Sequence, residues 1–278
     1  MSGPSPPSPV QAQALARTYD ARAYADTWDL VLDYFEVLDY HARHPTKRST
    51  AVGNALDLPR SRVRAWLDGA IPDPVRGIQR AEERGWLEAR AGSRVFRGLN
   101  VLSSWVYSGG SIEGQWYVPR FAVGGGDAVD RIDRAFAAVG TDYDFVRSSV
   151  QHRATEYRPI EDAAVLGRVL VVLGAPVGPK NDRTHIQLPA YLETAPDRIS
   201  HEFITTYLAN RGQRSPRKGT VTFREDRTHG YLRSLAGFIS DHTGERVTVS
   251  EKNVIVSAAA ASVIDRWPAV LGDVVVPS

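Results

Sequence analysis

Apolar residues recur at helical spacing along the first part of the chain. Between positions 24 and 38 they alternate with acidic residues and predict an amphipathic helix with an inward-facing stripe formed by Tyr24, Trp28, Val31, Leu32, Phe35 and Leu38. This helix is expected to end near His44, because the residue before a proline avoids the helical region. The Pro/Ser-rich start of the chain, residues 1–15, is expected to form a disordered tail.

Two short helices are predicted within residues 49–67. The first begins at a Ser/Thr cap at Ser49 and breaks at Asp57. The second restarts with Pro59 at its first position, where the missing N–H costs nothing. With a further helix over 72–87 they outline a helix-turn-helix module, which we assign to residues 16–95 of an all-α N-terminal part.

The second of these helices has a polar side suited to DNA. Its apolar face is formed by Val63, Trp66 and Leu67, which leaves on the open side Arg60, Ser61, Arg62 and Arg64. In a helix-turn-helix this N-terminal half enters the major groove, where arginine can bind guanine or phosphate through two N–H groups. We therefore predict that these four residues contact DNA. The simpler alternative is a solvated surface helix in an arginine-rich chain.

Two glycine-ended segments share a pattern at a separation of about a hundred residues. Residues 99–114 read LNVLSSWVYSGGSIEG, and residues 201–212 read HEFITTYLANRG. Each combines apolar residues at helical spacing with small residues before a glycine. Small side chains on one face allow two helices to approach closely, so the segments are predicted to pack together as parts of an internal duplication.

Both segments resemble the signature helix of the LAGLIDADG homing endonucleases. The Gly/Pro/Lys-rich connector over 166–180 and the stretch LPAYL at 188–192 are also similar to that family. The resemblance implies an α+β fold in which two αββαββα repeats, 96–180 and 181–278, are related by a pseudo-two-fold axis. Residues 115–123 read as a strand of the first repeat, although Pro119 disfavours a central position in a sheet. The resemblance further implies that polar strand faces and the loop QRSPRKG face DNA, with candidate contacts Arg120, Arg147, Arg153, Arg214, Arg217, Lys218, Thr222 and Arg224.

The chain departs from the family at the positions that bind metal. In active members the residue before the terminal glycine of each signature helix is an acid that holds divalent ions; here those positions are Gly109 and Arg211. Glycine has no side chain, and arginine places a permanent positive charge where a hard cation needs carboxylate oxygen. The nearest acids, Glu113 and Glu202, are displaced from the helix ends. No catalytic residue and no metal site are therefore expected.

Composition and motif content limit the partners, cofactors and cellular locations that the sequence allows. The formal net charge of +2 over 278 residues does not by itself predict a nucleic-acid partner, and the absence of cysteine excludes disulfides, thiol nucleophiles and cysteine-bound zinc. The scattered histidines lack metal-ligand spacing and no nucleotide-binding or hydrolase motif occurs, so we expect no cofactor. Without a membrane-length apolar run or a signal-peptide pattern, the protein is expected to be cytoplasmic, and nucleoid-associated when bound to DNA.

These patterns together favour a DNA-binding transcriptional regulator that has lost the cleavage chemistry of a homing endonuclease. The alternatives are an active or nicking endonuclease that uses unplaced acids, a maturase-like RNA binder, and a second domain that binds protein alone. The implied partner is double-stranded DNA, with no membrane. A homodimer, a small-molecule effector, the operator sequence and the direction of regulation are left open.

Overall fold

The chain folds into two compact units, of which one is helical in its described residues and the other contains both helices and strands. The structure, a computed structural model, describes residues 10–21, 23–124, 126–146, 155–179, 186–267 and 271. One unit comprises Gln11–Glu83 and the other runs from Arg84 onward and includes Val10. We call them the helical unit and the repeat unit. Two antiparallel sheets lie in the repeat unit, which confirms the predicted α+β class. Among the described residues, every helix is too short or too polar to cross a bilayer.

Within its described residues the helical unit consists of helices joined by short turns. They are α1 (Ala12–Ala16), α2 (Thr27–Arg43), α3 (Ser49–Leu56), α4 (Arg60–Leu67) and α5 (Asp73–Glu83). The predicted inward stripe of α2 is wrong at Leu32 and Phe35, which are 51% and 47% exposed. Val31 of the predicted stripe is buried, and the other buried positions are Thr27, Tyr34 and Val37. The ring of Tyr34 packs edge-on against Trp66 of α4, with 5.6 Å between centroids, and this contact sets which face of α2 turns inward.

The turn between α3 and α4 depends on one glycine. The N–H of Leu58 donates to the carbonyl oxygen of Gly53 at 2.9 Å, and a Cβ at Gly53 would lie 2.8 Å from the oxygen of Leu58. Asp57 turns the chain in the left-handed region, with φ of 55°. The predicted caps are each one position off, because Ser49 is the first residue of α3 and Pro59 precedes α4. This two-helix arrangement fixes the direction in which α4 leaves the turn.

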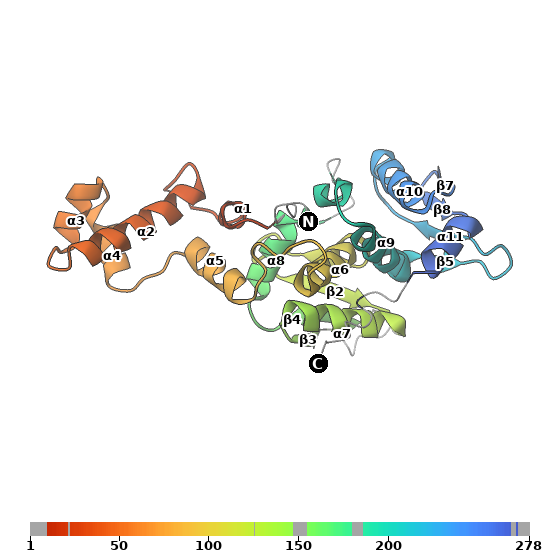
Figure 1. Cartoon of the computed structure of the whole chain (residues 1–278), viewed down its shortest axis with the longest axis horizontal. Helices are drawn as coiled ribbons and strands as arrows, with labels where there is room; N and C mark the ends of the chain where they lie inside the picture. Colours follow the sequence, from red (N-terminus) through yellow and green to blue (C-terminus); the bar gives the residue numbers. More distant parts are fainter. Residues whose placement is uncertain are drawn as a thin grey trace, which may run out of the picture. The chain divides into compact units, whose positions relative to one another are not determined.

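The repeat unit contains the same order of elements twice (Figure 1). The first set comprises α6 (Arg94–Ser108), β1 (Gly110–Ile112), β2 (Pro119–Val123), α7 (Asp127–Val139), β3 (Tyr143–Val146), β4 (Thr155–Pro159) and α8 (Ala163–Val172). After the 3-10 turn η1 (Ala190–Glu193), the second set comprises α9 (Asp197–Arg211), β5 (Gln213–Arg214), β6 (Val221–Arg224), α10 (His229–Thr243), β7 (Val247–Ser250), β8 (Asn253–Val256) and α11 (Ala258–Asp265). The sheets have matching strand orders, β1-β2-β4-β3 and β5-β6-β8-β7.

Strand β2 lies inside its sheet, between β1 and β4, and not at the edge that Pro119 favours. The strand begins at Pro119, four residues later than predicted. A proline at the first residue of a strand removes only a terminal ladder hydrogen bond, so the inner position is tolerated. Phe121 and Val123 then alternate inward with the pleat.

The two glycine-ended segments form α6 and α9, which pack against each other (Figure 1). Ser104 donates from its hydroxyl to the carbonyl oxygen of Phe203 at 2.7 Å, and Asn100 donates from its amide to that of Ile199 at 3.0 Å. Both side chains reach the opposite backbone directly because small residues keep the two helices close. The predicted packing of these segments is confirmed.

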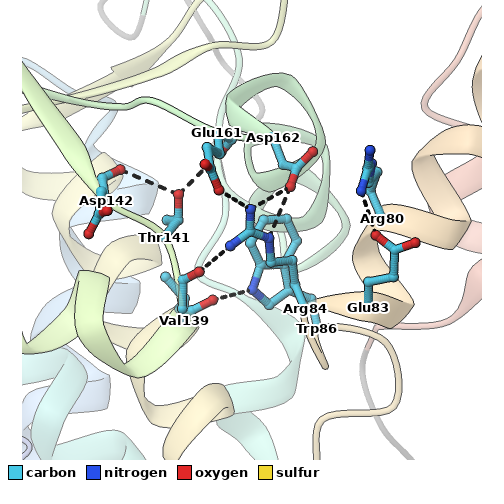
Figure 2. A network of polar contacts seen from close by, with 10 residues as sticks. Arg80, Glu83, Arg84, Trp86, Val139, Thr141, Asp142, Glu161 and Asp162 are labelled. Atoms are coloured by element: carbon cyan, nitrogen blue, oxygen red, sulfur yellow. Dashed lines mark hydrogen bonds and ion pairs between the residues drawn. The ribbon is translucent and has the colours of Figure 1, made fainter.

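The segment before α6 is held to the first repeat by a polar network (Figure 2). Arg84 donates to Asp162 at 2.9 Å and also binds Glu161 and the carbonyl oxygen of Gly140. The indole N–H of Trp86 donates to the carbonyl oxygen of Val139 at 2.8 Å. These contacts hold the chain to the end of α7 and the start of α8, so the repeat unit begins at Arg84, before α6 itself.

Acid is expected to destabilise the repeat unit through a buried histidine. His201 of α9 is 2% exposed and stacks on Trp267 with 4.7 Å between centroids. Burial, with the nearby His242 and Arg131, lowers the pKa of His201 from 6.5 to about 4. Between these values the unfolded chain binds a proton that the folded chain does not, so stability is complete above pH 6.5 and falls as the pH drops to 4. The expected loss is about 3 kcal/mol.

Urea unfolding at a series of pH values between 7 and 4 measures this effect. His201→Asn should reduce the dependence and leave the contribution of His242, whose pKa burial also lowers, whereas His229→Asn, at an exposed position, should leave it unchanged. An unaltered slope in His201→Asn would contradict the assignment.

Candidate nucleic-acid interface

Helix α4 presents a polar face above a buried apolar one. Val63 and Trp66 are buried, while Arg60, Ser61 and Arg64 are exposed. Arg64 lies 3.4 Å from Asp68 one turn later, and both side chains are largely in solvent. Such an exposed pair contributes little energy, so the guanidinium can exchange this carboxylate for another anion. Three of the four residues predicted on this helix therefore lie on an accessible surface.

Arg62 does not belong to that open face. Its guanidinium donates to the hydroxyl of Tyr24 at 2.7 Å and lies 4.6 Å from the ring centroid. Tyr24 in turn donates to Asp33 at 2.6 Å. Burial and the hydrogen bond to Asp33 raise the pKa of Tyr24 to about 12. The predicted place of Arg62 on the open side of α4 is wrong, because the half-buried side chain binds Tyr24 in the segment before α2; its contact with DNA stays a prediction.

The sheet of the second repeat has a polar face with no acidic residue on its strands. Val221 and Phe223 are buried on one side of β6, so Thr222 and Arg224 lie on the other. The register β6-β8-β7 places further residues on this same face, namely Asn253, Ile255, Thr248 and Ser250. The hydroxyl and amide groups of Asn253, Thr248 and Ser250 are the kinds that hydrogen-bond to base edges and phosphates. Asn253, Thr248 and Ser250 were missed in the sequence because their alignment across strands depends on the register.

The corresponding face of the first repeat is electrically balanced. Arg120 lies 3.6 Å from Glu156 on the neighbouring strand, and Arg158 lies 3.5 Å from Asp144. Because each cation has an acidic neighbour, this face offers a phosphate less attraction than the second sheet does. Arg120 is therefore a weaker candidate than predicted. Of the other candidates in this repeat, Arg147 and Arg153 lie outside the described residues.

The basic residues near the loop between β5 and β6 differ in whether they are paired with an acid. Arg217 and Lys218 are exposed, in a turn closed by the N–H of Gly219 donating to the oxygen of Ser215 at 2.9 Å. Arg214 instead forms an ion pair of 2.8 Å with Asp265 of α11. The loop thus presents Arg217 and Lys218 to solvent, while Arg214 is exposed but paired with an acid of α11, and its contact with DNA stays a prediction.

Neither α6 nor α9 ends at an acidic residue: Gly109 follows α6, and Arg211 is the last residue of α9. Gly109 has no side chain, and Nε of Arg211 lies 3.4 Å from a carboxylate oxygen of Glu225. Glu225 is buried and accepts a hydrogen bond from the hydroxyl of Tyr207 at 2.8 Å. Of the displaced acids, Glu113 is exposed and Glu202 is bound to Arg97 between the helices. Within the described part of the chain, no three potential metal-ligating side chains come together.

Comparisons of the sequence with protein-family models and with curated proteins give no match.

Proposed function

We propose that the protein is a sequence-specific, double-stranded-DNA-binding transcriptional regulator. In this proposal α3 and α4 act as a helix-turn-helix, and the repeat unit is a LAGLIDADG-like domain that does not cleave DNA. The main support for this proposal is the exposed face of α4, where Arg60 and Ser61 lie in the first turn and Arg64 lies one turn later, while Val63 and Trp66 are buried. The first turn belongs to the half of a recognition helix that contacts base edges.

The repeat unit supports the second part of the proposal. Its two halves have the same element order and sheet order, and α6 packs against α9 with side-chain-to-backbone hydrogen bonds between them. At the ends of these helices stand Gly109 and Arg211, neither of which can hold Mg²⁺. The acid-free face of the second sheet offers polar groups for a second DNA contact.

A charge-matched pair of double variants tests the role of α4. Duplexes are selected from a randomised pool with the wild-type chain, and affinity for the selected site is measured by fluorescence anisotropy in about 150 mM NaCl. Arg60→Ala/Arg64→Ala should weaken binding about 100-fold, since each bidentate arginine contact contributes about 1–3 kcal/mol. Arg43→Ala/Arg76→Ala removes the same charge from α2 and α5 and should cost less than about tenfold.

Equal losses in the two double variants would contradict groove reading by α4 and leave only nonspecific attraction. Circular dichroism of each variant establishes that the helical unit is folded. A selected sequence that binds no more tightly than a random duplex would overturn the proposed function as a whole.

A further inference from the structure

A pocket opens in the repeat unit where the first and second repeats meet. Its volume is about 530 Å³, within the range of pockets that hold small organic ligands. Ser111 of β1 and Gly178 and Pro179 of the connector line one part. The rest is lined by Arg211 at the end of α9 and by residues 224–227, which end β6 and follow it.

Three arginines line this pocket, and their side chains differ in burial. Arg211 and Arg224 are exposed at the rim, while the side chain of Arg227 is only 4% exposed. Nη2 of Arg227 donates to the carbonyl oxygen of Tyr107 at 2.7 Å. Nη1 of the same residue is buried and has no hydrogen-bond partner among the residues that the structure describes. A buried N–H without a partner is costly, so a small movement of Arg227 that brought this group to an acceptor would be favourable.

The two acids of the pocket are already engaged. Glu225 accepts from Tyr207 at 2.8 Å and lies within 3.5 Å of both Arg211 and Arg227. Asp226 is bound by Lys252, and this hydrogen bond holds the pKa of its carboxyl below the usual value. Counting Lys252, the four basic side chains outnumber the two acids. Guanidinium N–H groups beyond those bound to the acids therefore remain for a ligand.

We propose that this pocket binds the phosphate group of a phosphorylated small molecule. Guanidinium groups bind phosphate oxygens through paired, charge-assisted hydrogen bonds, and Arg211, Arg224 and Arg227 bring three of them to one cavity. The same chemistry could serve a phosphate of the DNA backbone. A free ligand is favoured because phosphates of a duplex lie on its outer surface, whereas Arg227 lies deep in the pocket wall. The inference goes beyond the proposed regulator and does not depend on α4 binding DNA.

Pyrophosphate is the probe, titrated into the full chain by calorimetry in about 150 mM NaCl without DNA. One saturable site per chain is expected. Arg211→Gln and Arg224→Gln, each at the exposed rim, should weaken it at least about tenfold, and Arg233→Gln, exposed on α10 outside the pocket, should not. Arg227 is left intact because it is packed against Tyr107 and Tyr231.

Three results would overturn the proposal. They are the absence of saturable heat, an equal loss in Arg233→Gln, and a failure to bind pyrophosphate while the rim variants lose affinity for a duplex. The last result would assign the guanidinium groups to the DNA backbone. Arg60→Ala/Arg64→Ala should retain pyrophosphate binding, which separates failure of this inference from failure of the proposed regulator.

Discussion

Glu202→Ala should destabilise the repeat unit by about 3–5 kcal/mol, the effect expected when one partner of a buried ion pair is removed. Arg97 of α6 and Glu202 of α9 are bound to each other, and each side chain is only 3% exposed. Loss of the carboxylate leaves a permanently charged guanidinium between two packed helices, where water cannot replace the missing oxygen. Equilibrium unfolding in urea measures the change in the free energy of unfolding.

A double variant separates loss of the ion pair from loss of packing. Arg97→Met/Glu202→Leu removes both charges and keeps much of the volume, so it should be more stable than Glu202→Ala alone, although it carries one more substitution. Charge is then the main cost of the single change. If the double variant were the less stable of the two, the unpaired charge of Arg97 would not be the main cost of the single change.

Local patterns predicted the parts of this molecule that depend on neighbouring residues. The exposed positions of Arg60 and Arg64 follow from helical periodicity around Val63 and Trp66. The packing of α6 on α9 follows from small residues at helical spacing in two similar segments. These features are set by one element or by a repeated pattern, so a single sequence contains enough information for them.

Contacts between distant residues were not predictable in the same way. Arg62 turns to Tyr24, 38 positions earlier, and Arg211 meets Glu225 beyond an intervening hairpin. The error in the predicted buried face of α2 has a related cause. Tyrosine carries a polar hydroxyl, so Tyr34 was not placed in the apolar stripe, but its ring packs on Trp66. The proposed phosphate pocket is lined by residues of β1, the connector, the end of α9 and the end of β6. Because these segments are far apart in the sequence, no local motif predicts the pocket.

Gly167→Ala should destabilise the repeat unit by about 3 kcal/mol, at the upper end of overpacking effects. A Cβ at this position of α8 would lie 1.7 Å from the carbonyl oxygen of Tyr117 and 3.2 Å from Cδ of Pro119. The obstacle is backbone, and Tyr117 has a φ of 57° and is covered by the guanidinium of Arg168, 3.9 Å from its ring centroid. Neither the loop nor the start of β2 can therefore move away at low cost.

The expected loss of stability in Gly167→Ala is opposite to the usual effect of this substitution in a helix. Replacing glycine by alanine inside a helix ordinarily stabilises by up to about 1 kcal/mol, because alanine loses less backbone freedom on folding. Gly237→Ala in α10 provides the matched control, since a Cβ there meets nothing within 4 Å and should give that ordinary gain. Opposite changes in the urea midpoint of the two variants are expected. A gain in Gly167→Ala would mean that α8 does not press on the loop before β2.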